Sequence, residues 1–245
     1  MQFESHRART RCFPVGHAHR VLHRALQRAV ESEVLARNVA SVVSPPTVDD
    51  REIEILTAEQ ITVVIDRLKG HPLYDIVVVD LTTGIRRGEL LALRLSDIDL
   101  DAATVRIEHS LEETKNGLRF KEPKTKQSKR TISLPPDAVA VLRERRRKLL
   151  ETRMALGLGK PNDDTLLFAE PDGSPTAPNR LTRRWQDACV SLCLPRVSFH
   201  ALRHTHASAL IAAGKDVVMI SRRLGHKNPT VTLNIYGHLF KRDDS

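Results

Sequence analysis

Hydrophobic positions at the start of the chain predict one amphipathic helix. Residues 1–13 are polar and basic and show no hydrophobic period, so we expect them to be disordered or poorly packed. Over residues 18–39, apolar side chains recur every three to four positions, which is the spacing of one helix face. Because a single amphipathic helix cannot bury its own apolar face, we expect it to pack on another part of the chain, on another subunit or on a segment that this chain lacks.

Later apolar spacings and capping signals predict further helices. We place these helices at about 57–68, 73–82, 86–93, 137–154 and 179–192. Thr57 and Gln60 have the spacing of a capping box at the start of the first of them. Gly84 interrupts the pattern, so Arg86 is predicted to stand at a helix N-terminus, where backbone N–H groups already favour an anion.

Residues 96–120 predict β structure instead. Part of this segment alternates between polar and apolar side chains, and Asn116 with Gly117 is a strong turn signal. A basic run over 122–130 precedes a short predicted strand at 131–134, so we expect a basic hairpin tip between two strands. The fold class that these patterns predict is α+β, mainly helical, with one small antiparallel β-sheet.

Composition favours a polyanionic partner. The chain has 245 residues, enough for one large or two modest domains, and its net charge is +9. Such an excess of Lys and Arg makes nucleic acid the first candidate. Aromatic residues make up only 4% of the chain, so we expect contacts with backbone phosphates rather than stacking on bases.

Cysteine usage and hydropathy indicate a reduced, cytoplasmic protein. Cys12, Cys189 and Cys193 form neither an even framework nor a CxxC pair. Cys189 and Cys193 have the spacing of one helix face, so both are predicted to be buried. No apolar run reaches the roughly 18–20 residues that span a membrane. The first 13 residues also lack the apolar core of a signal peptide.

The stretch 198–236 gathers side chains that suit phosphate chemistry. His200 and Arg203 are three residues apart and share one face of a helix. His226 lies in a break between two helical patterns, and Tyr236 lies in a short segment beyond it. Taken singly, a His is more often structural, an Arg more often solvated and a Tyr more often a packing residue. Together, these donors, cations and a phenol could surround a phosphate with a nucleophile beside it.

The histidines of this stretch raise the alternative of a metal site. There are five of them: His200, His204, His206, His226 and His238. Because no acidic or cysteine side chain accompanies them at the spacing of metal ligands, we expect no metal here.

Five short segments share a pattern with a known family: 83–90, 123–126, 200–204, 224–226 and 234–236. In these segments, which occur in the family's order over roughly residues 55–240, the chain resembles the catalytic domain of the tyrosine recombinases, the phage-integrase type of site-specific DNA recombinase. Each segment alone is a weak signal, but five in order make a coincidental match improbable. The resemblance implies a mainly helical catalytic domain that acts on double-stranded DNA.

The resemblance implies a role for each matching residue. Tyr236 would be the nucleophile that forms a 3′-phosphotyrosine. Arg86 and Arg203 would bind the non-bridging oxygens of the scissile phosphate, where fixed guanidinium groups stabilise the charge that grows in the transition state. Glu89 matches a residue that orients the first arginine from behind.

The remaining matches concern proton transfer. Lys124 would protonate the leaving 5′ oxygen; Lys126 is the alternative, and the Lys-Thr pair favours Lys124. His200 would assist proton transfer and position the phosphate, and His226 would donate a hydrogen bond to it. Because the phosphotyrosine conserves the energy of the phosphate ester, the resemblance implies neither a metal nor a nucleotide cofactor.

The resemblance also predicts the domain organisation. The family has a helical core-binding domain before the catalytic domain, and the two form a clamp around DNA. Residues 1–44 hold one clear helix and are predicted to be a remnant of that domain, with 45–56 as a linker and 57–245 as the catalytic domain. Only nine residues follow Tyr236, fewer than the family often uses to dock on a neighbouring subunit. Because the family assembles as a tetramer on DNA, we expect self-association.

The resulting prediction is a recombinase or integrase of a mobile genetic element that cleaves and rejoins DNA strands. The main alternative is a truncated, inactive DNA-binding or regulatory module, because the N-terminal region is short. Two further alternatives are a relative of the type IB topoisomerases, which would relax DNA without exchanging strands, and a basic RNA-binding protein of another fold.

Overall fold

The computed structural model describes residues 2–44, 53–122 and 129–240, with side chains described from residue 15 onward. The chain divides into two compact units, Met1–Glu52 and Ile53–Ser245. Among the described residues, no helix is both long and hydrophobic enough to cross a lipid bilayer.

The first unit is built on one long helix, α1 (Gln2–Glu31), followed by a short 3-10 helix, η1 (Val39–Val42). The predicted helix at 18–39 is wrong at both ends, because α1 begins at the second residue and stops well before 39. Residues 1–13 were expected to be disordered or poorly packed; residues 2–13 are helical and belong to α1, so the expectation of disorder is wrong for them. A hydrophobic period reveals only the packed face of a helix, so it misses a helical segment that lacks this period.

The chain turns back after α1 through a residue that cannot continue the helix. Glu33 adopts a left-handed φ of 58°, a conformation outside the right-handed helical region. Asn38 then donates from Nδ2 to the carbonyl of His23 at 3.0 Å and ties the returning segment to α1. Val21 and Leu22 on α1 are more than half exposed, so the other described residues of the first unit do not cover this apolar face.

The second unit contains the helices that spacing and capping signals predict. Its helices are α2 (Ala58–Leu68), α3 (Tyr74–Thr83), α4 (Arg87–Leu90), α5 (Pro136–Ala155), α6 (Pro178–Ser191), α7 (Phe199–Ala212), α8 (Val217–Leu224) and α9 (Pro229–Tyr236), with short 3-10 turns η2 (Leu95–Asp97) and η4 (Gly237–Leu239). The predicted capping box of Thr57 and Gln60 is present at the start of α2. The helix after Arg86 is confirmed but is only one turn long.

The β structure forms two small antiparallel sheets in the described residues, not the single sheet that was predicted. Strands β1 (Ile98–Asp99), β2 (Thr104–Ile107) and β5 (Arg130–Ser133) form one sheet, and β3 (Ser110–Thr114) with β4 (Gly117–Lys121) forms the other. β5 pairs with β2 rather than with β4. The basic run between β4 and β5 therefore connects two sheets, and the prediction that it is a hairpin tip is wrong. This sheet pairing is a long-range contact that local patterns do not encode.

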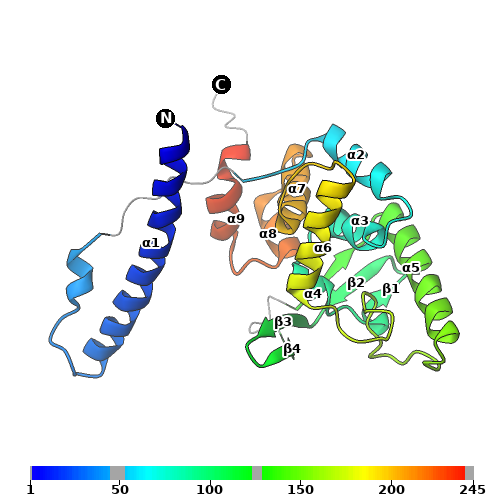
Figure 1. The fold of residues 1–245 in the computed structure, drawn as a ribbon, viewed down its shortest axis with the longest axis horizontal. Coiled ribbons are helices and arrows are strands. Elements are labelled where there is room, and N and C mark those ends of the chain that lie inside the picture. The colour runs from blue at the N-terminus through cyan, green and yellow to red at the C-terminus, as the bar shows by residue number, and fades with distance from the viewer. Residues whose placement is uncertain (1, 45–52, 123–128, 241–245) are drawn as a thin grey trace. The chain divides into compact units, whose positions relative to one another are not determined.

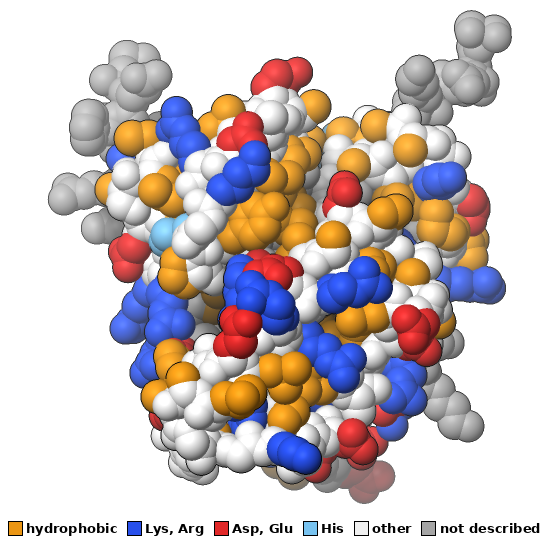
Figure 2. All heavy atoms as spheres, turned by 90° about the vertical axis from the view of Figure 1, so that its right-hand side faces the viewer, with side chains coloured by type: hydrophobic (Ala, Val, Ile, Leu, Met, Phe, Trp, Pro, Cys, Tyr) orange, Lys and Arg blue, Asp and Glu red, His pale blue; other side chains and the backbone are white. Residues whose placement is uncertain are grey.

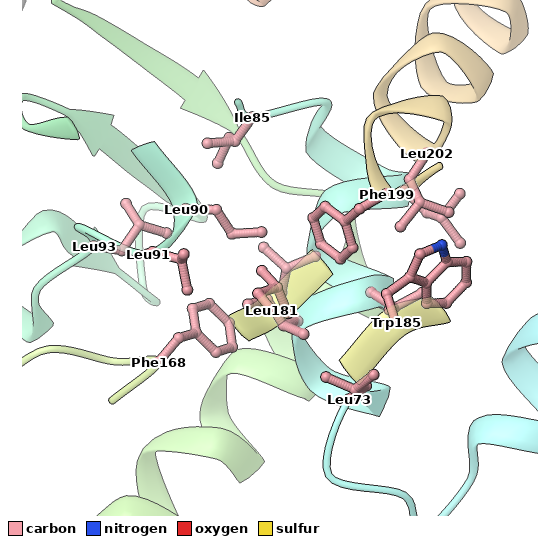
Figure 3. Packing of buried hydrophobic residues seen from close by; sticks show 14 of the residues in the cluster. Leu73, Ile85, Leu90, Leu91, Leu93, Phe168, Leu181, Trp185, Phe199 and Leu202 are labelled. Carbon is pink, nitrogen blue, oxygen red and sulfur yellow. The ribbon is translucent and has the colours of Figure 1, made fainter. Parts of the chain in front are cut away.

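α3 is the central helix of the second unit, and nearly all of its side chains are buried. It packs against both α5 and α7 (Figure 1). In the core beside it, Trp185 of α6 and Phe199 of α7 meet edge to face with ring centroids 6.1 Å apart (Figure 3). This contact anchors the first residue of α7, the helix that carries much of the candidate site. Cys189 is buried on α6, but Cys193 lies beyond the end of that helix and is exposed, so its predicted burial is wrong.

The face of the second unit that carries α5 is balanced in charge. Basic and acidic side chains are interspersed on it (Figure 2). Arg147 pairs with both Glu144 and Glu151 on the same helix, and Lys148 approaches Asp75 at 3.5 Å. A cavity of about 590 Å³ lies between α3, α5 and α6, and none of the candidate site residues lines it. Because Arg147 and Lys148 already have acidic partners, we do not expect these two cations to bind phosphates.

Candidate active site

Three consecutive helices carry the residues that sequence reasoning places around a phosphate. His200 and Arg203 lie in the first turns of α7, His226 follows the end of α8, and Tyr236 is the last residue of α9. α8 packs against both α7 and α9. A small hydrophobic cluster joins the three helices: Ala207, Ile211, Ile220, Leu224 and Tyr236. This packing brings segments that are distant in sequence to one place.

The guanidinium groups of Arg86 and Arg203 are fixed on neighbouring backbone carbonyls. Arg203 donates through Nη2 to the carbonyl of Leu224 at 2.7 Å and through Nη1 to the carbonyl of Gly84. Arg86 donates through Nη2 to the carbonyl of Gly225 at 2.5 Å. Carbonyls at a helix C-terminus lack intrahelical donors and carry the negative end of the helix dipole, which favours cations there. The two arginines therefore reach the same site from different elements.

Two glycines leave the space that these arginines occupy. Gly84 and Gly225 have φ values of 64° and 65°, which L side chains rarely adopt. A Cβ at Gly84 would lie 2.7 Å from the ring of His206. A Cβ at Gly225 would lie 2.7 Å from Nη1 of Arg130 and 3.1 Å from Nη1 of Arg86. Any larger residue at either position would push the arginine cluster or its supports apart.

Glu89 links Arg86 to a further arginine, Arg130. Glu89 Oε1 accepts a hydrogen bond from Arg86 Nη1 at 2.9 Å, and Glu89 Oε2 accepts one from Arg130 Nη2 at 2.8 Å. Burial by itself raises the pKa of Glu89, but the hydrogen bonds and charges of Arg130 and Arg86 outweigh it and hold this pKa below its usual value. Glu89 is thus an ionised carboxylate between two guanidinium groups. Its contact with Arg86 is the one that the sequence resemblance implies.

Tyr236 is almost fully buried, with 1% of its surface exposed. Its hydroxyl lies 2.6 Å from Nδ1 of His204. Burial raises the pKa of Tyr236 to about 12, while the charge of Arg203 acts in the opposite direction. His204 is a site residue that sequence reasoning missed. Its spacing could have indicated it: His204 follows His200 by four residues, so the two share one side of a helix. On α7 their rings meet edge to face with centroids 4.6 Å apart.

His200 and His226 are held uncharged at neutral pH. Burial lowers the pKa of each to about 4, and the positive charge of Arg203 contributes to both shifts. His226 Nδ1 also shares a hydrogen bond with Thr232 Oγ1 at 2.8 Å, which fixes its ring on the first half of α9. Neutral imidazoles at this site can donate or accept a hydrogen bond without adding charge.

Lys124 and its alternative Lys126 lie outside the described residues, which resume at 129. The five other predicted site residues are all described, and the contacts above place them in one cluster: Arg86, His200, Arg203, His226 and Tyr236. The individual roles assigned to them remain predictions.

A buried carboxyl group, Asp80, lies behind this cluster and was not predicted from the sequence. Asp80 is 1% exposed, and its Oδ1 has no hydrogen-bond partner among the described residues. Burial raises its pKa well above the usual range, while the nearby charge of Arg203 acts against the shift. A protonated Asp80 leaves the positive charge of Arg203 available to an anion from outside.

A second histidine network supports the cluster and makes stability depend on pH. Arg223 donates from Nε to His206 Nε2 at 3.0 Å, so the His206 proton resides on Nδ1 and is donated to the carbonyl of Leu81 at 2.9 Å. Burial lowers the pKa of His206 to about 4. The unfolded chain takes up a proton near pH 6.5, and the folded chain does so only near pH 4. The unfolded state therefore binds more protons in this window, and stability falls as the pH drops through it.

We expect His206→Gln to reduce this acid sensitivity. Between pH 7 and pH 5, the free energy of unfolding of the wild type should fall by about 1–2 kcal/mol more than that of the variant. Urea unfolding at the two pH values measures the difference. His238→Gln, which changes an exposed histidine, is the matched control and should keep the wild-type pH dependence. Equal losses in wild type and His206→Gln would contradict the assignment.

Comparison with known proteins identifies what this chain resembles. A family model described as the phage integrase family matches residues 54–243. The chain is 30% identical to a XerC-like tyrosine recombinase of Caldanaerobacter subterraneus, over 87% of this chain and 59% of the relative. It is 28% identical to the ICEBs1 integrase of Bacillus subtilis, over 89% of this chain and 60% of the relative. It thus spans about three-fifths of the length of these curated relatives.

Solved structures share the fold. The Tn1549 transposon integrase, solved in complex with transposon right end DNA, superposes with a TM-score of 0.73 at 24% identity, over 89% of this chain and 72% of that one. The XerA recombinase superposes with a TM-score of 0.59 at 23% identity, over 83% of this chain and 67% of that one. At these identities the likeness concerns the fold alone, which agrees with the predicted mainly helical α+β class.

Proposed function

Since this chain belongs to the phage integrase family, we propose that it cleaves and rejoins DNA strands through a covalent bond between Tyr236 and a DNA 3′-phosphate. The observation that carries the proposal is the convergence of two guanidinium groups on consecutive carbonyls, those of Leu224 and Gly225. A phosphodiester is an anion, and fixed guanidinium forks are suited to bind its non-bridging oxygens.

The proposed reaction balances without an added reactant. The Tyr236 oxygen attacks phosphorus as its phenolic proton passes to water, the bond from phosphorus to the 5′ oxygen breaks, and the leaving oxygen takes a proton to become a hydroxyl. We assign that proton to Lys124. In the second step the 5′ hydroxyl of a partner strand loses its proton and attacks phosphorus, the bond from phosphorus to the Tyr236 oxygen breaks, and that oxygen takes up a proton. Because each step exchanges one phosphate ester for another, neither a nucleotide nor a metal is needed for the balance.

The two arginines differ in how accessible they are to a phosphate. Arg86 has 38% of its side chain exposed and can meet a phosphate directly. Arg203 is 3% exposed, and α9 carries the equally buried Tyr236 beside it. A phosphate can therefore reach Arg203 and Tyr236 only if α9 shifts and the hydroxyl leaves His204. We assign His200 and His226 the role of uncharged hydrogen-bonding groups to the phosphate.

DNA is the proposed partner, with self-association on it. The net charge of +9 and the solved complex of the Tn1549 integrase with DNA support DNA as the partner. Because phosphate contacts release counterions, we expect the dissociation constant for duplex DNA to rise at least about tenfold between 50 and 200 mM salt. Fluorescence anisotropy with a labelled duplex measures it, and an affinity that does not change with salt would contradict phosphate contacts.

A second candidate function is DNA binding without strand cleavage. The burial of Tyr236 and its hydrogen bond to His204 favour this candidate, because a sequestered hydroxyl cannot attack. We also propose that residues 1–44 belong to a helical core-binding domain, with 45–56 as a linker and 57–245 as the catalytic domain. The division of the chain after Glu52 and the family match from residue 54 support this arrangement.

Trapping on nicked DNA tests the proposed function. A library of nicked duplexes with a randomised centre is incubated with the full chain, and complexes that survive SDS are collected and sequenced. A nick near the cleaved bond lets the short leaving strand diffuse away, so the covalent complex accumulates. Recovery of a shared sequence in SDS-stable complexes is the expected result. Salt-sensitive binding without an SDS-stable product would favour the DNA-binding module instead.

A further inference from the structure

Three consecutive carbonyls at the end of α8 each accept a hydrogen bond from a different arginine. The carbonyl of Arg223 accepts from Arg130 Nε at 2.8 Å. The next two, those of Leu224 and Gly225, accept from Arg203 and Arg86. The three arginines come from β5, α7 and the start of α4. One short peptide segment thus sets the relative positions of three guanidinium groups.

Arg130 also completes the surroundings of Glu89. It donates from Nη2 to Oε2 at 2.8 Å and from Nη1 to Oε1 at 3.2 Å, a bidentate pair. The side chains of Arg130 and Glu89 are 7% and 6% exposed, so the pair is shielded from water. Arg86, by contrast, has 38% of its side chain exposed. The buried end of this network is the Arg130–Glu89 pair, and its solvent-exposed end is Arg86.

We propose that Arg130 is a positioning residue for the reaction: through Glu89 and the end of α8, it holds the Arg86 guanidinium in the orientation that binds the phosphate. This inference rests on the proposed function. Arg130 acts through Glu89 rather than on the phosphate itself, because its Nε, Nη1 and Nη2 already donate to the Arg223 carbonyl and to Glu89.

The physical need for Arg130 follows from the burial of Glu89. A buried carboxylate is costly unless charged donors compensate it. The hydrogen bond from Arg130 is the largest of the effects that lower the pKa of Glu89. Without Arg130, the partly exposed Arg86 would be the main cation left beside the carboxylate. Protonation of Glu89 would then remove one acceptor of the ion pair that orients Arg86.

The glycine at 225 fits this assignment. A Cβ there would lie 2.7 Å from Arg130 Nη1 and 2.9 Å from its Cζ. The guanidinium of Arg130 therefore fills the space that a side chain at 225 would take. Sequence reasoning placed Arg130 at the end of a basic hairpin tip, but Arg130 lies in β5, which pairs with β2, and its side chain is buried.

Arg130→Met tests the proposal on the trapped nicked substrate identified by the library selection. We expect the rate of covalent complex formation at saturating DNA to fall at least tenfold, with the dissociation constant of the non-covalent complex changed less than twofold. We also expect the ratio of variant to wild-type rate to fall further as the pH is lowered from 7 to 5, because in the variant Glu89 has lost Arg130 and takes up a proton in this range. Adding Glu89→Gln should remove this extra pH dependence.

Arg223→Met is the matched control. Arg223 is half-buried in the same region and donates to His206 and to Ser133, and none of its hydrogen bonds described above goes to Glu89. Its loss should lower the melting temperature but leave the ratio of variant to wild-type rate independent of pH. If Arg130 had only a structural role, Arg130→Met should likewise have a lower melting temperature and a ratio of variant to wild-type rate that does not change with pH.

The outcomes separate this proposal from the proposed function. If the wild type forms no covalent complex on any library member, the function itself fails. If the wild type reacts and Arg130→Met keeps at least half its rate with an unchanged pH profile, the positioning role is overturned. Should Arg130→Met fail to fold, Arg130→Lys keeps the charge but loses the bidentate fork. It should react at least threefold more slowly with unchanged DNA affinity, and a wild-type rate for Arg130→Lys would overturn the proposal.

Discussion

Replacing Tyr236 with phenylalanine is expected to abolish the covalent protein–DNA complex while leaving the fold nearly intact. The substitution removes the attacking oxygen and keeps the ring that packs between α7, α8 and α9. The lost hydrogen bond to His204 should cost about 0.5–1.5 kcal/mol of unfolding free energy. Denaturing gels of the trapped nicked substrate measure the complex, and thermal unfolding measures stability.

Tyr74→Phe is the matched control, because the chain has only two tyrosines. Tyr74 is the first residue of α3 and packs at the edge of the main core. Its variant should form the covalent complex at the wild-type rate. A covalent complex of normal yield from Tyr236→Phe would show that another residue is the nucleophile.

Arg203→Ala carries the second largest expected effect, and it acts on both reaction and stability. Removing a preorganised donor to the reacting group typically slows the chemical step by about 100–1000-fold. The carbonyls of Gly84 and Leu224 would also lose their donors in a buried region, which costs about 1–3 kcal/mol each when no water replaces them. Arg203→Lys keeps the charge but cannot reproduce the fork, so it should recover stability only in part.

Arg67→Ala separates these effects. Arg67 also donates to two successive carbonyls, those of Leu192 and Cys193, at 2.9 and 2.8 Å, but it lies on α2 and is exposed. Its removal should change strand cleavage less than twofold. Single-turnover rates on the trapped substrate compare the two variants. Similar rates for Arg203→Ala and Arg67→Ala would refute a role for Arg203 at the phosphate.

The helices of the second unit could be predicted because their signals are local. Thr57 with Gln60 marks the start of α2, and the apolar spacing after it gives the length of the helix. The five described site residues could be named because they lie in short segments that match the family. The start of α1 could not be predicted, since its polar first half has no hydrophobic period.

The supports of the site could not be predicted because they depend on contacts between distant segments. Arg130 ends a run of cations that resembles any solvated loop until β5 pairs with β2. His204 stands beside His200 in a matched segment, yet only the packing of α9 on α8 brings it to Tyr236. Asp80 looks like one polar residue in an apolar helix until its burial beside Arg203 is known.

The most direct test of the central claim is to map the attachment point of DNA on the protein. Trypsin should release residues 228–241 as one peptide that contains Tyr236, and residues 70–86 as another that contains Tyr74. After nuclease treatment of the trapped complex, mass spectrometry should find a nucleotide adduct on Tyr236 in the first peptide. An adduct elsewhere, or cleaved DNA with no adduct on either peptide, would contradict attack by Tyr236 on a phosphate held by Arg86 and Arg203.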